Sequence, residues 1–330
     1  MPNNERTGDC YETQQTYKNT NIMELILNNY GASLNCENEA LVITNNDGKQ
    51  RLPLDGIRSI SISKGARISS DAVMLAIEKE IEIVFIDKSG HPVGRVWSPK
   101  YGSISTIRKG QLLFTQSVAA VDWIKGILSK KIENQQAMLL MFRLEDEESR
   151  RRIEKSIAQL EKFRQKILQA EGDMVSDIAV NLRGWEGQSA QLYFSAINSV
   201  IPPTYRFEKR TQHPAMDIFN LLLNYGYGVL YRNVEGALIK SGIDPYIGVL
   251  HRDEYNRPVL VYDVIELYRV WVDYVVVSFI SQNVITDEYY SVASDGSHWL
   301  EPLGRRILIQ ALNDYLEETI DVLGVTRSRR

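Results

Sequence analysis

The side chains best suited to chemistry in this chain are one imidazole and a set of carboxylates in its C-terminal half: His251, Glu186, Asp263, Glu266 and Asp273. Imidazole nitrogen and carboxylate oxygen, with no thiolate, form a ligand set for a hard octahedral cation such as Mg²⁺ or Mn²⁺. Such an ion polarises a phosphodiester, lowers the pKa of an attacking hydroxyl or water, and stabilises the leaving oxygen. The residue types therefore predict metal-dependent phosphoryl chemistry that needs no protein nucleophile.

Three of the acids lie in one apolar stretch, PVLVYDVIELYRVWVD, which predicts a single helix over 261–282. Asp263, Glu266 and Asp273 stand at i, i+3 and i+10 and would share one face of that helix. Carboxylates with so many apolar neighbours are unfavourable unless a cation or a hydrogen-bond donor compensates them. A metal ion is the simplest compensation, and an ordinary polar stripe along the helix is the alternative.

Glu186 stands between Gly184 and Gly187 in a stretch that otherwise predicts a helix over 174–200. Each glycine destabilises a helix by about 1 kcal/mol relative to alanine, so the pair suggests that a ligand or a second helix approaches closely. His251 follows a turn over 242–245 and precedes the acid-bearing helix. A lone histidine is usually an ordinary core or surface residue, and only its position marks His251 as a candidate ligand.

Several common classes of enzyme are excluded by what the chain lacks. It has no glycine-rich phosphate loop, no Cys-x-x-Cys, no His-Glu-x-x-His and no Gly-x-Ser-x-Gly. Its formal charge of −4 argues against a generally cationic nucleic-acid binder but not against a local basic groove. Two cysteines are too few for a disulfide framework, and no apolar run is long enough to span a membrane or resemble a signal peptide. We expect a soluble, cytoplasmic protein.

The N-terminal part of the chain alternates short β-like runs with turns. Residues 1–21 are polar throughout and predict a disordered leader. Residues 22–98 predict a β-rich domain with a hairpin at Asn46–Asp47–Gly48, one helix over 70–80, a strand over 82–87 and a last hairpin near 89–97.

From residue 103 onward, apolar residues recur with the 3.6-residue period of an α-helix. The pattern predicts helices over 104–115, 119–142, 145–170, 174–200, 215–231, 234–241, 261–282 and 304–323. The charge-dense stretch 145–166 predicts a solvated or coiled-coil-like face, with a DNA-facing surface as the alternative. The expected fold class is α+β: a small β-rich domain, then a larger all-α domain (103–330) that carries the chemistry.

Five stretches resemble the CRISPR-associated integrase family Cas1, in that family's order: LRGWEGQSAQLYF, HPAMDIFNLLLNYGYGVLY, SGIDPYIGVLH, PVLVYDVIELYRVWVD and GRRILI. The β-rich front half and KIENQ at 131–135 are also similar. The resemblance implies a β-rich domain that dimerises and a helical catalytic domain. It implies two such dimers flanking a dimer of the small partner protein Cas2, a complex that inserts new spacers into a CRISPR array.

By motif, the resemblance assigns Glu186, His251 and Glu266 as ligands of Mg²⁺ or Mn²⁺ and as the catalytic residues. In some family members an aspartate replaces Glu266. Asp263 would have an auxiliary role. The implied reaction joins the 3′-hydroxyl of a protospacer fragment to a phosphodiester of the repeat by transesterification.

DNA-binding side chains are harder to assign. The candidates are Arg206, Lys209 and Arg210, with His213, in a loop-like stretch between helices, and Arg305 and Arg306 at the start of another predicted helix. An ordinary solubilising surface is the alternative for each. Rival functions are a stand-alone metal nuclease acting on branched DNA or RNA, and a non-catalytic DNA-binding scaffold of the adaptation complex. A purely structural helical protein would have no reason to bury three acids in one helix.

Overall fold

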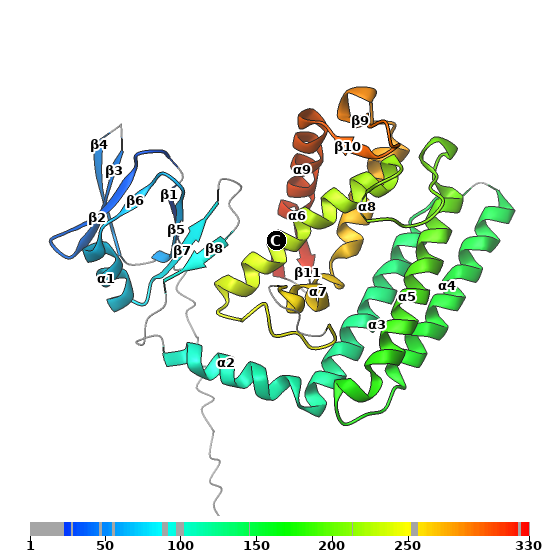
Figure 1. The fold of residues 1–330 in the computed structure, drawn as a ribbon, viewed down its shortest axis with the longest axis horizontal. Coiled ribbons are helices and arrows are strands. Elements are labelled where there is room, and N and C mark those ends of the chain that lie inside the picture. The colour runs from blue at the N-terminus through cyan, green and yellow to red at the C-terminus, as the bar shows by residue number, and fades with distance from the viewer. Residues whose placement is uncertain are drawn as a thin grey trace, which may run out of the picture. The chain divides into compact units, whose positions relative to one another are not determined.

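The computed structural model of the chain forms two compact units, Met1–Tyr101 and Gly102–Arg330, each described here by itself (Figure 1). The structure describes residues 23–27, 29–45, 48–54, 57–87, 92–96, 102–144, 146–212, 214–251, 257–322 and 325–329. The predicted leader lies outside them. Within the described residues, no helix is both long and apolar enough to cross a membrane.

Two four-stranded sheets make up most of the N-terminal unit. One has the order β1 (Met23–Leu27), β5 (Ile57–Ser63), β7 (Glu82–Ile86), β8 (Pro92–Arg95), and the other β4 (Gly48–Leu52), β3 (Ala40–Asn45), β2 (Ser33–Glu37), β6 (Arg67–Ile68). β5 pairs in parallel with both neighbours, and its Ser59 and Ser61 are buried like its isoleucines. Burial on both faces is typical of a central parallel strand.

Sequence patterns predicted several of these elements closely. Asn45, the last residue of β3, pairs with Gly48, the first residue of β4, as a hairpin requires. The turn residues Asn46 and Asp47 lie outside the described residues. The predicted helix over 70–80 is α1 (Ser70–Glu78), which begins where the Ser69 hydroxyl accepts from Ala72 N at 3.2 Å. Apolar side chains of both sheets and α1 form one core.

Helices dominate the C-terminal unit: α2 (Gly102–Thr115), α3 (Val118–Leu140), α4 (Glu147–Leu168), α5 (Val175–Val200), α6 (Ile218–Lys240), α7 (Val259–Ile265), α8 (Arg269–Ser281) and α9 (Pro302–Glu317), with 3₁₀ turns at Pro203–Tyr205 and Asp287–Tyr289. Helices α3, α4 and α5 pack side by side, and α6 packs on α7, α8 and α9 (Figure 1). α3 also contacts α7 and α8, which brings the two groups together.

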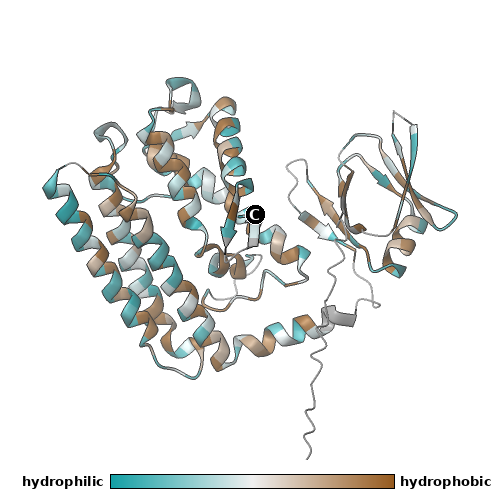
Figure 2. Cartoon of the chain, turned by 180° about the vertical axis from the view of Figure 1, so that it is seen from behind, coloured by the Kyte–Doolittle hydropathy of each residue, from teal (hydrophilic) through white to brown (hydrophobic). Residues whose placement is uncertain are grey.

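The charge-dense helix α4 has a solvated outer face. Its arginines pair with glutamates of the same helix, as Arg152 does with Glu148 at 2.8 Å, while Ile153, Leu160 and Ile167 are buried. α4 is largely hydrophilic in Figure 2. Because these cations are already compensated, the geometry favours the predicted solvated face over a DNA-facing surface.

The α+β fold class is confirmed, but the helical unit departs from the predicted elements in three places. The two helices predicted over 215–231 and 234–241 are one helix, α6. The helix predicted over 304–323 ends at Glu317 and continues as β11 (Thr319–Val322), which pairs with β12 (Val325–Ser328). A second two-stranded ribbon, β9 (Tyr290–Val292) and β10 (His298–Leu300), also interrupts the predicted all-α domain.

The most consequential departure is that the helix predicted over 261–282 is two helices, α7 and α8. In a continuous helix the Leu267 carbonyl would accept from Trp271 N, but Trp271 N donates to Tyr268 O at 2.9 Å. The amide of Asn134 in α3 donates to the Leu267 carbonyl instead, at 3.0 Å. The helical spacing of apolar residues continues across this break, so that spacing alone could not reveal it.

Candidate active site

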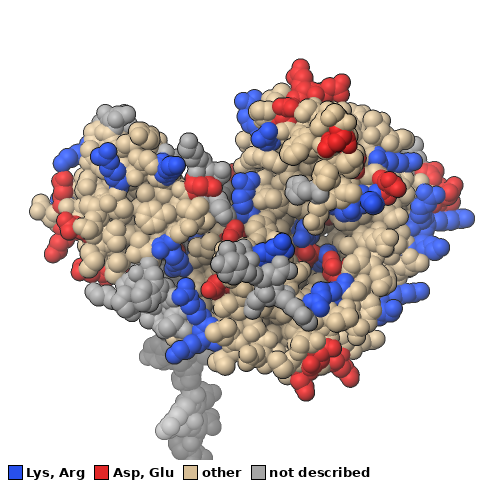
Figure 3. Space-filling view, in the orientation of Figure 1, with Lys and Arg blue, Asp and Glu red and all other residues tan. Residues whose placement is uncertain are grey.

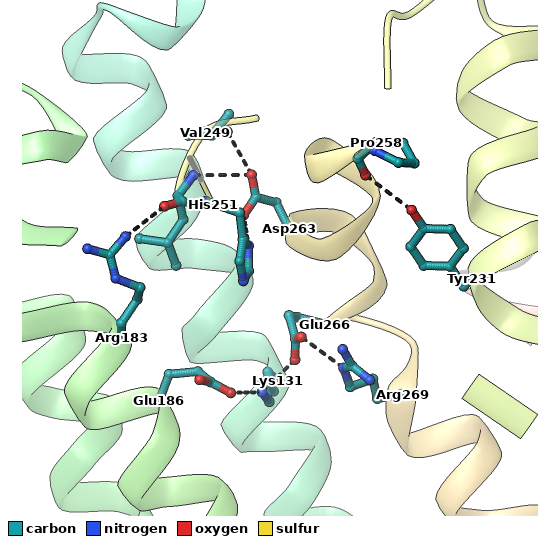
Figure 4. A network of polar contacts seen from close by, with 11 residues as sticks. Lys131, Arg183, Glu186, Tyr231, Val249, His251, Pro258, Asp263, Glu266 and Arg269 are labelled. Carbon is teal, nitrogen blue, oxygen red and sulfur yellow. Dashed lines mark hydrogen bonds and ion pairs between the residues drawn. The ribbon is translucent and has the colours of Figure 1, made fainter. Parts of the chain in front are cut away.

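The two predicted carboxylate ligands, Glu186 and Glu266, meet at one buried lysine. Glu186 lies in the middle of α5 and Glu266 is the C-terminal cap of α7. Between them lies the ammonium group of Lys131 from α3, whose side chain is 7% exposed (Figure 4). Its Nζ pairs with Glu186 Oε1 and lies 2.5 Å from Glu266 Oε2. The break between α7 and α8 presents Glu266 to this lysine.

A second cation holds the other oxygen of Glu266. The Nε of Arg269, at the start of α8, donates to Glu266 Oε1 at 2.8 Å (Figure 4). Burial raises the pKa of Glu266, but the charges of Arg269 and Lys131 outweigh burial and hold that pKa below its usual value. Burial likewise lowers the pKa of Lys131, and the two glutamates more than reverse it. Glu266 therefore remains ionised and Lys131 protonated.

His251 is held in position by Asp263. The buried Asp263 carboxylate accepts from the backbone N–H of Val249 at 2.7 Å, of Leu250 at 3.1 Å and of His251 at 3.2 Å, and contacts His251 Nδ1 at 2.7 Å. The imidazole extends from Asp263 toward the side where Glu186 and Glu266 lie (Figure 4). With Nδ1 hydrogen-bonded to Asp263, Nε2 remains for a ligand, which is the usual arrangement of a metal-binding histidine.

Charges around His251 favour its protonated form. The hydrogen bond to Asp263 raises the pKa of His251 more than burial lowers it, and Glu266 and Glu186 raise it further. The Arg183 guanidinium, one turn before Glu186 on α5, donates to the Leu250 carbonyl at 3.2 Å and ties the histidine segment to that helix.

The glycines flanking Glu186 face open space. A Cβ added at Gly184 or Gly187 would meet no heavy atom within 4 Å. The crossing of a second helix at this point, one of the two explanations for the glycines, is therefore wrong. The remaining one, close approach of a ligand to α5 beside Glu186, agrees with the geometry.

Asp273 lines the same cavity as Glu186 and Glu266, but it lies on α8 rather than α7, so the predicted common face of three acids on one continuous helix is wrong. The break at 266–268 turns Asp273 toward Tyr193 and Tyr227, whose hydroxyls donate to its two oxygens at 2.9 and 2.5 Å. Burial raises the pKa of Asp273 to about 6, against the opposing effect of these hydrogen bonds and of Arg269 and Arg210.

Metal binding fits the donor set. Among the described residues, no three His, Cys, Asp or Glu side chains lie close enough together to hold an ion in the present conformation. A cation nevertheless lies between Glu186 and Glu266, namely the Lys131 ammonium. Glu266 Oε2 is buried and, although near that ammonium, has no hydrogen bond of good geometry. This unused oxygen, the Glu186 carboxylate and the imidazole Nε2 are ligands that Mg²⁺ or Mn²⁺ would accept.

A cavity of about 150 Å³ opens beside these residues. Besides Glu186, Glu266 and Lys131, it is lined by Arg210, Gln212 and Arg269. Both arginines lie over the ring of Tyr227, with guanidinium carbons 5.5 and 4.8 Å from its centroid. Guanidinium groups beside a carboxylate pair are suited to a phosphodiester held against the ligands.

Of the five predicted DNA-contacting residues, only Arg210 lines this cavity. Arg206, Lys209 and Arg306 are on the surface or partly exposed elsewhere in the helical unit, and His213 lies outside the described residues. Arg305 lines a second cavity, on a different part of α6. Lysines and arginines on the face drawn in Figure 3 alternate with acidic side chains rather than forming one continuous strip.

Lys131, Asn134 and Arg269 were missed as site residues. A signal for Lys131 was present, because it continues the buried stripe of α3 through Ile124 and Leu128. A lysine on a buried helix face requires an anion, and it could have been paired with the acids. Nothing in the sequence indicates that Asn134 caps a break in another helix.

Three comparisons identify relatives of the chain. The family model described as CRISPR associated protein Cas1 matches residues 25–314. A CRISPR-associated endonuclease Cas1 of Archaeoglobus fulgidus is 32% identical over 92% of this chain and 90% of its own length. One of Pyrobaculum aerophilum is 31% identical over 77% and 81%.

Solved structures share the fold. A casposase bound to integration product has a TM-score of 0.70 at 19% identity, covering 92% of this chain and 90% of that one. A CAS1 protein from Thermotoga maritima has a TM-score of 0.69 at 20% identity, covering 93% and 91%. With a family model that spans most of the sequence and a relative of similar length, this chain belongs to the CRISPR associated protein Cas1 family.

Proposed function

We propose that this chain is a CRISPR spacer-acquisition integrase, a divalent-metal-dependent enzyme that joins the 3′-hydroxyl of a protospacer fragment to the CRISPR repeat. The observation that carries the proposal is the approach of Glu186 and Glu266 to one shared cation, with His251 held toward them by Asp263. The names of relatives support it, since they include CRISPR-associated endonucleases and a casposase bound to integration product.

Glu186, His251 and Glu266 would hold Mg²⁺ or Mn²⁺, which when bound supplies Lewis-acid polarisation of the phosphodiester. In the transfer step the incoming 3′-hydroxyl loses its proton as its oxygen forms a bond to phosphorus, the bond to the departing 3′-oxygen breaks, and the departing oxygen takes up a proton. Asp263 keeps the His251 ring in one orientation throughout. Arg210 and Arg269 would carry the charge of the phosphodiester oxygens in the cavity.

Partners are proposed on the same basis. Structures titled as Cas1–Cas2 and Cas1–DNA complexes share the fold, which supports double-stranded DNA and Cas2 as partners of this chain. We assign dimerisation to the β-rich N-terminal unit and catalysis to the helical unit. Two dimers of this chain would flank one dimer of Cas2.

A metal nuclease is the second candidate function, favoured because the relatives are named endonucleases. The same site would act with water in place of the 3′-hydroxyl and release two ends rather than join them. A non-catalytic scaffold is disfavoured, since it would have no use for a buried carboxylate and a partly buried one at one cation.

The test is a strand-transfer assay on a supercoiled plasmid carrying a repeat array, with Cas2, Mn²⁺ and a labelled protospacer. Glu186→Gln should abolish label transfer while the circular-dichroism spectrum and the oligomeric state stay unchanged. Glu154→Gln, at an exposed glutamate of α4, is the control and should transfer normally. Cleavage without label transfer would favour the nuclease, and full transfer by Glu186→Gln would refute the site.

A further inference from the structure

Gln135 of α3 has a buried side chain whose oxygen is unpaired. The residue is 5% exposed, and its Oε1 accepts no hydrogen bond from any of the described residues. A buried acceptor without a donor destabilises the folded state, and most buried side-chain oxygens in proteins are therefore paired. Gln135 also lines the cavity of the carboxylate site. An unpaired oxygen at this place indicates a donor that reaches it in another conformation of the site.

Lys131 lies one helical turn before Gln135 on the same face of α3. Residues four apart are neighbours on a helix surface, and the later side chain leans back over the turn that precedes it. Both residues line the cavity, and both are buried. A donor and an acceptor therefore lie within one turn of each other, although the ammonium of Lys131 pairs with the two glutamates in the present conformation.

Metal binding at the proposed ligands would displace this ammonium. It lies between Glu186 and Glu266, 2.5 Å from Glu266 Oε2, where a divalent ion would have to contact the same oxygens (Figure 4). Two cations repel each other too strongly at short range to share that place. The side chain of Lys131 is only 7% exposed, so a small movement keeps its ammonium inside the protein. A displaced ammonium that stays buried needs another acceptor.

Gln135 is the buried acceptor that remains for it. Among the carboxylates and carboxamides that line the cavity in the described part of the chain, the two glutamates would hold the metal. Both oxygens of Asp273 already accept from tyrosine hydroxyls. Gln212 is exposed. The unpaired Oε1 of Gln135 is therefore the acceptor best placed to receive the ammonium.

We propose that Lys131 is a displaceable counter-ion with two positions: between the two glutamates when no metal is bound, and on Gln135 Oε1 when a divalent ion holds them. Gln135 then supports metal binding without contacting the metal, because it makes the movement of Lys131 less unfavourable. The ammonium also stays in the cavity that Arg210 and Arg269 line, where the phosphodiester is proposed to bind. The inference rests on the proposed metal site and adds to it the place to which its resident cation moves.

Mn²⁺ titration calorimetry on the full chain, without DNA, tests the inference. Gln135→Met removes the acceptor and nearly keeps the size of the side chain, and it should weaken Mn²⁺ binding by roughly 10-fold, as expected for the loss of one hydrogen bond to a charged group. Lys131→Met should strengthen Mn²⁺ binding, because no ammonium then competes with the ion. Adding Gln135→Met to Lys131→Met should have no further effect on Mn²⁺ affinity, since the group that Gln135 would receive is absent.

Stability separates this role from a merely structural one. In EDTA, Gln135→Met should be at least as resistant to urea as the wild type, because the oxygen that it removes has no partner in the present conformation. Gln136→Met is the matched control. Gln136 follows on the same helix but donates to Ile157 O of α4 at 3.1 Å, so its replacement should lower stability and leave Mn²⁺ affinity unchanged.

The outcomes distinguish this inference from the proposed function. Unchanged Mn²⁺ affinity in Gln135→Met, or an equal loss with and without Lys131, would overturn the inference and leave the metal site standing. Gln135→Met and its control decide the question even where Lys131→Met does not fold. Mn²⁺ binding that survives Glu186→Gln would overturn the metal site and this inference together. Absence of strand transfer, with Mn²⁺ affinity still dependent on Gln135, would defeat only the proposed function.

Discussion

The ammonium group of Lys131 lies 2.5 Å from Oε2 of Glu266 and also pairs with Glu186, so one buried cation joins the two proposed metal ligands. Two carboxylates this close, with no cation between them, would repel each other in a poorly solvated site. Lys131 compensates them in the present conformation. A divalent ion bound at the same oxygens would take over that compensation, and Lys131 would then have to move away.

Replacing Lys131 by methionine should therefore destabilise the metal-free protein. Removing one partner of a buried ion pair leaves the other uncompensated and typically costs about 3–5 kcal/mol. Urea unfolding in EDTA should show this loss, and Mn²⁺ should recover much of it, with a larger Mn²⁺ stabilisation than in the wild type. Lys130→Met is the control, because Lys130 is 59% exposed and, among the described residues, pairs only with Glu133 on the same helix. Weaker Mn²⁺ binding by Lys131→Met would contradict this explanation.

Asn134→Ala should weaken the positioning of Glu266 although Asn134 does not contact that carboxylate. The variant leaves the Leu267 carbonyl without its donor, which costs about 1–3 kcal/mol for a buried group, and loosens the break that presents Glu266. We expect lower stability together with weaker Mn²⁺ binding, measured by unfolding and by titration calorimetry.

Gln136→Ala is the matched control for that variant. Gln136 also donates to a backbone carbonyl, Ile157 O at 3.1 Å, but toward α4 and away from the carboxylates. It should lower stability and leave Mn²⁺ affinity unchanged. If both variants bind Mn²⁺ like the wild type, Asn134 does not position Glu266.

Asp273 should make stability depend on pH. Because burial raises its pKa from 3.8 to about 6 in the folded chain, the folded state holds a proton that the unfolded state releases between those pH values. The stability associated with that proton is fully present below pH 3.8 and is lost as pH rises through about 6. Asp273→Asn stays neutral, so the difference in unfolding free energy between variant and wild type should shift in favour of the variant as pH rises from 4 to 7. A constant difference would show that Asp273 is ionised throughout.

Much of the fold could be predicted, because it depends on local patterns. The 3.6-residue spacing of apolar side chains predicted the long helices to within a few residues. The resemblance to family motifs singled out the proposed ligands Glu186, His251 and Glu266. The break at 266–268 could not be predicted, since Asn134 stabilises it from a helix more than a hundred residues away. For the same reason the sequence placed Asp273 and Glu266 on one continuous helix, although the structure places them on two helices and pairs Asp273 with Tyr193 and Tyr227.

Two glycines of α6, Gly226 and Gly228, should respond oppositely to alanine. A Cβ at Gly226 would lie 2.4 Å from Val272 Cγ1 of α8, so Gly226→Ala must push α6 and α8 apart and should destabilise the protein by about 1–3 kcal/mol. Gly228 faces the open second cavity, so Gly228→Ala should be neutral or stabilise α6 by up to about 1 kcal/mol through helix propensity. Urea unfolding of both variants measures the two effects. Equal destabilisation by both alanines would contradict the packing described for α6.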